Sequence, residues 1–129
     1  MKLLLDTHAL LWWLSDDTRL GRTARNDIAD ASNDILVSVV SLWEIVVKVR
    51  IGKLEADIAA VERAIRHDAF ERLAIAPAHL AMLATLPMHH RDPFDHLLIA
   101  QAIGEAAVLL SDDLHMALYP VETMRCGGT

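Results

Sequence analysis

Short apolar runs alternate with helix-like segments along almost the whole chain, and this alternation limits the fold more than any other feature. The expected strands are 2–5, 34–38, 72–76, 108–110 and 121–124, and the expected helices are 7–14, 21–31, 41–50, 57–67, 77–86 and 92–103. The strands do not alternate apolar and polar residues, as is typical when helices cover both faces of a sheet. The sequence therefore predicts an α/β fold with a short, mostly parallel central sheet flanked by helices.

The length of 129 residues is common for a single domain. We expect one domain over residues 1–125 and a loose tail over 126–129, which contains two glycines and the only cysteine, Cys126. One cysteine excludes an internal disulfide and a cysteine-based metal site. The apolar run 9–14 is too short to span a bilayer or to form a signal-peptide core, so we expect a cytoplasmic protein without a membrane partner.

The formal net charge is −6. A passive nucleic-acid binder neutralises phosphates with a basic surface, and this chain as a whole repels them. Cations recruited by clustered carboxylates would reverse the sign locally. The positions of the acids therefore matter more than their number.

Several acids fall where an open α/β sheet binds its ligands, outside the carboxyl ends of the strands. Asp6 closes the first strand, and Asp112 and Asp113 follow the fourth. Glu44 and Asp95 are each expected in the first turn of a helix, which would point back toward the strand ends. Four carboxylates would then meet in one cleft, where their mutual repulsion favours a proton on at least one of them.

Two of these acids also have a structural interpretation. Asp6 is placed to cap the helix that follows it. Ser41 and Glu44 fit a capping box, and Lys48 lies four residues on for an ion pair with Glu44. The sequence leaves capping and ligand roles open for both acids.

The later acids divide more clearly. Asp92 is followed by proline, which is typical of an N-cap and the first helical position. Asp95 heads an apolar stripe, which is unusual for a solvated surface residue. One of Asp112 and Asp113 is expected to be a turn residue.

Other chemistries lack their motifs. The sequence has no glycine-rich phosphate loop, no Gly-x-Ser-x-Gly elbow and no lysine after Lys53 that could serve a phosphoryl-accepting receiver domain. His89 and His90 are adjacent on an irregular segment, where two imidazoles rarely converge on one ion. With no His-Glu-x-x-His helix either, zinc is not expected.

Four segments in order carry a family resemblance. They are LLLDTHALLWW at 3–13, SVVSLWEI at 38–45, HHRDPFDHLLIAQ at 89–101 and LLSDD at 109–113, with Tyr119 six residues later. Together they resemble the PIN-domain ribonucleases, specifically the VapC-type toxins of bacterial toxin–antitoxin pairs. The family commonly has an aromatic residue where this chain has Met116, a difference that concerns packing.

The resemblance implies a PIN-like fold and a set of functional residues. Its catalytic, metal-binding acids fall on Asp6, Glu44, Asp95 and Asp113, and its small hydroxyl residue falls on Ser111. Carboxylate ligands without nitrogen or sulfur partners suit Mg²⁺ or Mn²⁺.

The implied activity is metal-dependent endoribonuclease cleavage of RNA phosphodiester bonds, leaving 5′ phosphates and 3′ hydroxyls. Arg91 precedes the Asp92–Asp95 turn and is the best-placed residue to hold a flanking phosphate. Arg19 and Lys48 are among the other cations considered for that role. His8 and His96 are not required as bases.

The resemblance also implies partners: an RNA substrate, a cognate antitoxin whose tail covers the acids, and a second copy in a homodimer. A non-cleaving PIN-like module that binds RNA or protein stays an alternative, as does an α/β domain whose acids are all caps. The consecutive large apolar residues 10–14 cover more than half of the circumference of one helix. We therefore expect at least one to lie at the molecular edge, unless Trp12 or Trp13 packs under the helix expected at 21–31.

Overall fold

Five short strands form one sheet in the computed structural model, which describes residues 1–127. The elements are β1 (Lys2–Leu5), α1 (Thr7–Leu14), α2 (Arg22–Ala29), β2 (Asp34–Ser38), α3 (Val39–Arg50), α4 (Ile58–His67), β3 (Glu71–Leu73), α5 (Pro77–Thr85), α6 (Pro93–Gly104), β4 (Val108–Leu110), η1 (Leu114–Leu118) and β5 (Thr123–Met124). The strand order is β3-β2-β1-β4-β5, and every neighbouring pair is parallel. The predicted α/β class is confirmed.

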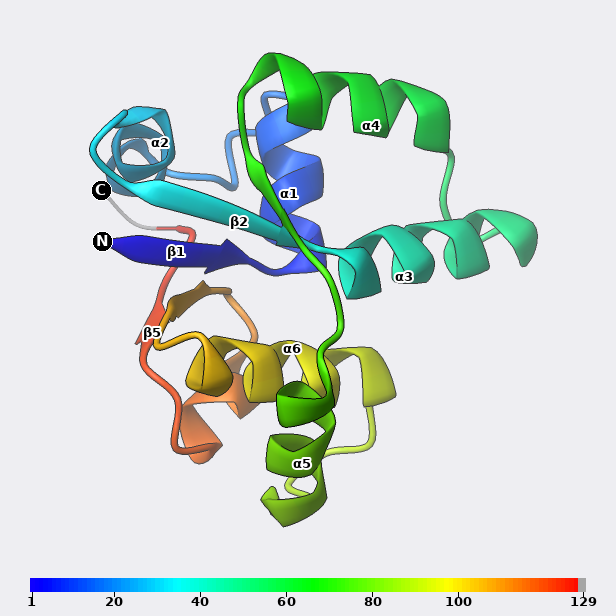
Figure 1. Cartoon of the computed structure of the whole chain (residues 1–129). Coiled ribbons are helices and arrows are strands. Elements are labelled where there is room, and N and C mark those ends of the chain that lie inside the picture. The colour runs from blue at the N-terminus through cyan, green and yellow to red at the C-terminus, as the bar shows by residue number, and fades with distance from the viewer. Residues whose placement is uncertain (128–129) are drawn as a thin grey trace.

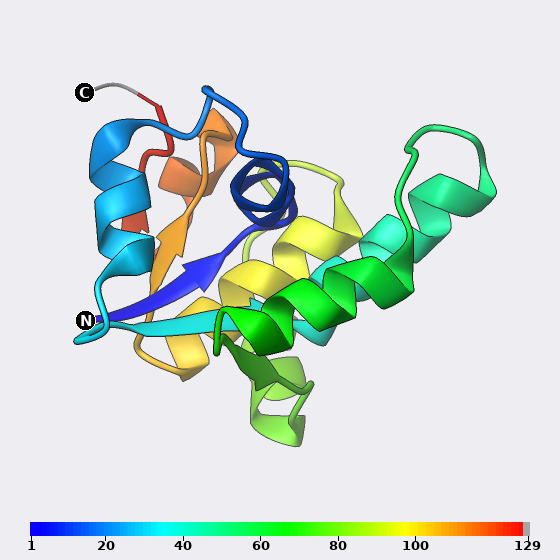
Figure 2. The ribbon, with the colours of Figure 1, turned by 90° about the horizontal axis from the view of Figure 1, so that it is seen from above.

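Helices cover the sheet on both sides (Figure 1), with α1, α2 and α4 on one face and α5 and α6 on the other. Figure 2 shows α1, α2 and α4 spread across the strands from above. The side chains of β1 alternate between two cores: Leu3 and Leu5 pack with α1, α2 and α4, whereas Leu4 packs with α6. All three are fully buried. Because helices cover both faces, the central strands β1, β2 and β4 are mostly apolar, whereas the edge strand β3 carries the exposed Glu71 and Arg72.

The carboxyl ends of β1 and β4 meet at the centre of the sheet. The chain builds outward from β1 through β2 to β3, and then returns to the other side of β1 with β4. The backbone N–H of Asp6 donates to the carbonyl oxygen of Leu110 at 3.1 Å, directly past the two strands. A point where the strand order reverses is where open α/β sheets bind ligands.

Helix α3 begins earlier than the sequence predicts. Ser38 is both the last residue of β2 and the N-cap of α3, and its hydroxyl oxygen accepts from the N–H of Val40 at 3.0 Å. Ser41 lies inside the helix, so the expected Ser41–Glu44 capping box is wrong. The β-branched Val39 and Val40 suit a strand, which conceals a strand that passes directly into a helix.

Two other boundaries differ. The strand expected at 72–76 is Glu71–Leu73, and it pairs only with β2 at the edge of the sheet. Gly104, expected to stop α6, is its last helical residue, and the left-handed residue is Ala106 with φ of +53°. A Cβ on Gly104 would lie 3.3 Å from Cδ2 of the buried His79, so glycine there serves close packing between α5 and α6.

The expected loose tail is wrong at Cys126, which is 1% exposed and belongs to the core. Its N–H donates to Oδ1 of Asp112 at 2.6 Å, and its carbonyl oxygen accepts from the N–H of Gly21 at 2.7 Å. Residues 128–129 of the expected tail lie outside the described residues. Among residues 1–127, no helix is long and apolar enough to cross a membrane.

The apolar residues of α1 reach the molecular edge, as expected. Leu11 to Leu14 are all only partly buried. Trp13 packs near β3 rather than under α2: its ring lies 5.9 Å from that of Phe70, and its Nε1 donates to Oδ2 of Asp68 at 2.9 Å.

Candidate metal centre

Asp6 caps a helix and also faces the cleft. Its Oδ1 accepts from the N–H of Ala9 at 2.7 Å, which confirms the cap of α1, and the residue is only 4% exposed. Burial raises the pKa of Asp6, and a hydrogen bond from the Ser111 side chain opposes that rise. The Asp6 carboxylate thus has the Ser111 side chain as a partner in addition to the N–H that it caps. Capping and a ligand role are therefore compatible for this residue.

Ser111 connects the ends of β1 and β4. Besides contacting Asp6, its hydroxyl oxygen accepts from the N–H of Asp113 at 3.1 Å. Asp113 caps η1 by accepting from the N–H of His115 at 2.9 Å. Burial raises the pKa of Asp113, but the hydrogen bonds and charge of His115 outweigh it, so the pKa is lowered overall. The expected supporting place of Ser111, beside the last acid, agrees with this geometry.

Asp112 points to the end of the chain instead. Its Oδ1 accepts from Nε of Arg125 at 3.1 Å and from the N–H groups of Cys126 and Gly127 at 2.6 and 3.2 Å. This carboxylate therefore fixes the last described residues, a structural role that differs from the turn role expected of one member of the Asp112–Asp113 pair.

Glu44 enters the cleft from the second turn of α3, not from the first turn as predicted. It is 3% exposed. The Thr7 hydroxyl donates to its Oε1 at 2.7 Å, and Lys48 Nζ donates to its Oε2 at 2.6 Å, which confirms the expected ion pair. The hydroxyls of Thr7 and Ser41 are 3.0 Å apart.

Asp95 lies in the first turn of α6, as predicted, and Asp92 caps that helix by accepting from the N–H groups of Phe94 and Asp95 at 2.9 and 3.2 Å. Burial is the main cause that raises the pKa of Asp95 to about 8. The further causes are the charges of four neighbouring acids: Asp92, Glu44, Asp113 and Asp6. The charges of the other three predicted site acids therefore act on Asp95, but among residues 1–127 only Asp113 of these shares a group of possible metal ligands with it, and Asp6 and Glu44 lie outside that group.

His90 is a neighbour that the sequence did not reveal. Its Nε2 lies 3.4 Å from Oδ2 of Asp95, and its Nδ1 lies 2.7 Å from the hydroxyl of Tyr119. Burial and the charge of His96 lower the pKa of His90. Both adjacent histidines pack edge-on against the Tyr119 ring, with 5.0 Å between centroids for His89 and 5.4 Å for His90, but of the two only His90 belongs to the group of possible metal ligands found among the described residues.

A second histidine approaches from η1. Nδ1 of His115 lies 2.9 Å from Oδ1 of Asp113, and the His115 ring stacks on His90 with 5.2 Å between centroids. The spacing Asp-x-His at 113–115 is a local signal that could have identified this contact. His90 offered no such signal, because the orientation of its ring toward Asp95 depends on a contact with Tyr119, 29 residues later in the chain.

The donor atoms fit a divalent cation. One atom each from His90, Asp95 and Asp113 lie within 4.8 Å of one another. The set is dominated by carboxylate oxygens, the ligands that Mg²⁺ and Mn²⁺ prefer. Burial first and the repulsion of neighbouring acids second raise the pKa of Asp95, and a bound cation would relieve the repulsion. Arg91 is exposed on the segment before α6.

Comparison with known proteins places this geometry in a family. The PIN domain family matches residues 3–121. A chain in the crystal structure of VapBC2 from Rickettsia felis bound to a DNA fragment from their promoter has a TM-score of 0.74 at 16% identity, covering 97% of this chain and 98% of that one.

Two further structures are similar. A chain of DNA-bound VapBC from Salmonella typhimurium has a TM-score of 0.71 at 12% identity over 97% of this chain and 98% of that one. A chain of VapBC-5 from Mycobacterium tuberculosis has a TM-score of 0.60 at 20% identity over 98% of each. No curated protein matches the sequence. At these identities the structural likeness concerns the fold, whereas the family match spans most of the sequence. The chain belongs to the PIN domain family.

Proposed function

We propose that this protein is a metal-dependent endoribonuclease, the VapC-type toxin of a toxin–antitoxin pair. The observation that carries the proposal is the acidic site at the carboxyl edge of a PIN-domain sheet. Asp95 and Asp113 offer donor atoms within 4.8 Å of one another, and burial and the charges of Glu44 and Asp6 raise the pKa of Asp95 to about 8. The likeness in fold to chains of VapBC complexes supports the toxin assignment. We place the protein in the cytoplasm, with its RNA substrate.

The proposed ligands of Mg²⁺ or Mn²⁺ are Asp6, Glu44, Asp95 and Asp113. Such a cation lowers the pKa of a bound water and stabilises the leaving 3′ oxygen of a phosphodiester. The protein's part is to hold the carboxylates in place: Ser111 bonds Asp6, and Thr7 donates to Glu44. Because Asp6 and Glu44 are buried, charges in the cleft interact more strongly than in bulk water.

RNA is the proposed substrate despite the net charge of −6. Bound cations would offset the acids locally, and the exposed Arg91 is placed to hold a flanking phosphate. Lys48 is a weaker candidate for that role, because its ammonium group already pairs with Glu44 at 2.6 Å.

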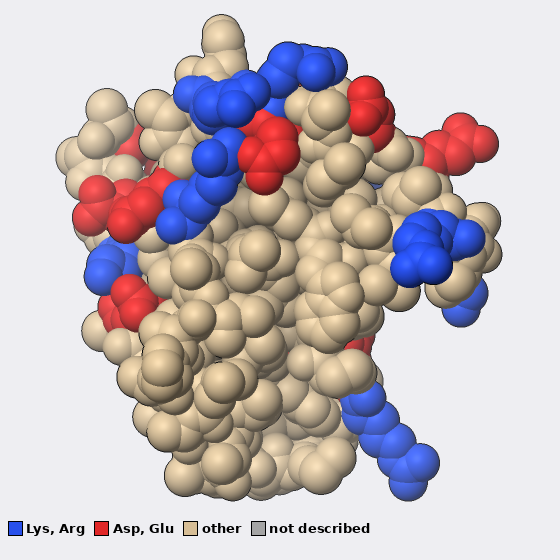
Figure 3. Space-filling model, turned by 45° about the vertical axis from the view of Figure 1, so that its right-hand side comes forward, with Lys and Arg blue, Asp and Glu red and all other residues tan. Residues whose placement is uncertain are grey.

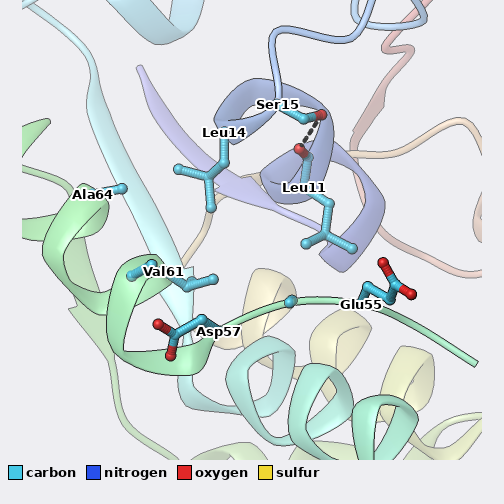
Figure 4. A pocket seen from close by; sticks show the side chains of 9 residues that line it. Leu11, Leu14, Ser15, Glu55, Asp57, Val61 and Ala64 are labelled. Atoms are coloured by element: carbon cyan, nitrogen blue, oxygen red, sulfur yellow. Dashed lines mark hydrogen bonds between the residues drawn. The ribbon is translucent and has the colours of Figure 1, made fainter. Parts of the chain in front are cut away.

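The proposed antitoxin has an apolar groove available beside α1. Leu11 and Leu14 of α1 face Val61 of α4 across a hollow of about 300 Å³, with Glu55 and Asp57 at its rim (Figure 4). Apolar antitoxin side chains would fill this groove, and its acidic rim suits a basic neighbour. A basic side chain of the same partner would reach the candidate metal centre.

A second copy of the chain has a candidate contact face as well. The lower half of the surface in Figure 3, at the level of α5 and α6, carries few charged side chains. Leu80 of α5 is 50% exposed, and Met88 after it is 77% exposed. We propose this face as the homodimer contact, because large exposed apolar patches mark interaction sites. Analytical sedimentation tests this contact: the wild type is expected to sediment as a dimer, and Leu80→Glu as a monomer.

Cleavage of a mixed RNA pool tests the proposed activity. The wild type is expected to cut RNA with Mg²⁺ or Mn²⁺ and to stop when chelator is added, leaving 5′ phosphates and 3′ hydroxyls. A metal-induced rise in melting temperature without cleavage would favour the non-cleaving binding module instead. No cleavage and no rise would leave the acids with capping roles alone.

A further inference from the structure

A hollow of about 320 Å³ lies directly beside the acidic cluster. Its lining residues are Asp6, His8, Trp12, Arg19, Asp112 and Asp113. Two of them, Asp6 and Asp113, are proposed metal ligands. Three others, His8, Trp12 and Arg19, have flat side chains with π-faces and no part in the proposed chemistry.

The flat side chains of His8 and Arg19 both lie against the ring of Trp12, the His8 ring tilted to it by 32°. Cζ of Arg19 lies 4.9 Å from the ring centroid of Trp12, and the ring of His8, one helical turn earlier in α1, lies 5.8 Å from that of Trp12. Asp17 holds the guanidinium in this place: Nε and one terminal nitrogen of Arg19 donate to its two carboxylate oxygens at 3.1 and 2.7 Å. The stacking surface therefore exists before any ligand arrives.

Core packing explains only part of this arrangement. Trp12 is only partly buried: it packs against the core and also lines the hollow. The side chain of Arg19 is 67% exposed, so packing does not require its position over Trp12. Since Asp17 already balances its charge, Arg19 offers a face for stacking more than a charge for a phosphate.

We propose that this hollow, the stacking subsite, receives a nucleobase of single-stranded RNA adjacent to the scissile phosphate. The inference rests on the proposed function and adds to it a place where one unstacked base is held. Such bases stack on aromatic rings and on guanidinium planes, whereas the bases of a duplex are not available. A volume of about 320 Å³ lies within the usual range for ligand sites. Because every base has a π-face, the subsite adds affinity with little sequence preference.

Binding measurements with and without bases test the subsite. The protein carries Asp95→Asn to prevent cleavage, and the two ligands are oligouridylate and an abasic ribose-phosphate strand of the same length. The parent is expected to prefer oligouridylate, and Trp12→Leu to reduce that preference by about fivefold or more, which corresponds to roughly 1 kcal/mol for one stacked base. Trp12→Phe, which keeps an aromatic face, is expected to retain most of it.

Two further variants separate stacking from folding and from charge. Arg19→Lys changes an exposed side chain, keeps its charge and removes its planar face, so it is expected to weaken only the base-bearing strand. Trp43→Ala removes a tryptophan that is 52% exposed on α3, outside the hollow, and is expected to leave the preference unchanged. Melting temperatures confirm that each variant is folded.

Several outcomes would overturn the subsite. One is an unchanged preference for bases in both Trp12→Leu and Arg19→Lys, and another is its loss in Trp43→Ala. Lost affinity for the antitoxin with unchanged RNA binding would assign the hollow to the protein partner. If wild-type cleavage persists in these cases, only the subsite fails. If the wild type neither binds nor cleaves RNA, the proposed function fails with it.

Discussion

Asp95 is surrounded by negative charge, and its side chain is only 15% exposed. Its pKa of about 8 in the folded chain lies above the ordinary value of 3.8, so between these values the folded state binds a proton that the unfolded state has lost. The stability of the metal-free protein therefore falls as pH rises through this window.

Asp95→Asn is expected to flatten that decline, because it removes the charge and keeps the shape. Between about pH 5 and about pH 8, the wild type in chelator is expected to lose up to about 4 kcal/mol more than the variant. Thermal unfolding of both proteins at the two pH values measures the difference. Equal losses would contradict the environment described for Asp95.

Divalent cations are expected to reverse the same strain. Millimolar Mg²⁺ or Mn²⁺ binds the folded state and should raise the melting temperature of the wild type above that in chelator. The rise should be much smaller for Asp95→Asn, which lacks one ligand charge, and nearly unchanged for Asp92→Asn, since asparagine is a good N-cap. A wild type that ignores both metals would speak against a shared cation site.

At this scale the sequence predicted the acids better than their surroundings. The caps at Asp6 and Asp92 could be predicted, because capping depends on residues within one turn. The contacts of Glu44 with Thr7 and of His90 with Asp95 depend on how separate elements pack. Residue spacing carries no information about such packing.

Helix α3 differs most between prediction and structure. Ser38 caps the helix and also donates to Oε1 of the buried Gln101, so it connects the end of β2 to α6. The sequence offered Ser41 as an equally good cap. Both serines are fully buried, and the difference is that Ser38 contacts the N–H of Val40 and Gln101 whereas Ser41 contacts Thr7. The strands could be predicted within a few residues, because continuous apolar runs bounded by polar residues are a local signal.

Ser38→Ala is expected to destabilise the protein by about 2–3 kcal/mol, because it removes a cap and leaves a buried amide oxygen without its donor. Ser41→Ala is expected to cost less, since Thr7 retains its bond to Glu44. Urea unfolding of both variants measures this order. A larger loss for Ser41→Ala would restore the capping role that the sequence predicted.

At the scale of the whole molecule, the strand order reverses once, at β1 and β4. Two proposed contact surfaces lie outside that point: the groove between α1 and α4, and the face formed by α5 and α6. The parallel sheet and the convergence of β1 and β4 could be predicted from the alternation of strands and helices. The groove between α1 and α4 could not, because it depends on how far α4 lies from α1 after a long connection. The burial of Cys126 could not be predicted, because it depends on a hydrogen bond from its N–H to Asp112, 14 residues earlier in the chain.

Silencing by the antitoxin is predicted at this scale. Saturation with the protein encoded beside this chain should suppress cleavage while raising the melting temperature, because the partner binds the folded state. Ala60→Glu places a charge in the groove of Figure 4 and should weaken the complex about tenfold or more, and Ala59→Glu, an exposed residue of the same helix outside the groove lining, is the matched control. Full cleavage in a saturated complex would contradict this account.

The most direct test of the central claim compares two aspartates three residues apart. Cleavage of one RNA substrate is measured in a single turnover with Mn²⁺ for the wild type, Asp95→Asn and Asp92→Asn. The loss of a proposed metal ligand is expected to reduce the rate of Asp95→Asn at least about a hundredfold, whereas Asp92→Asn keeps its cap and stays within about threefold of the wild type. Equal activity of Asp95→Asn and the wild type, or equal losses in the two variants, would contradict the assignment of Asp95 to the metal centre.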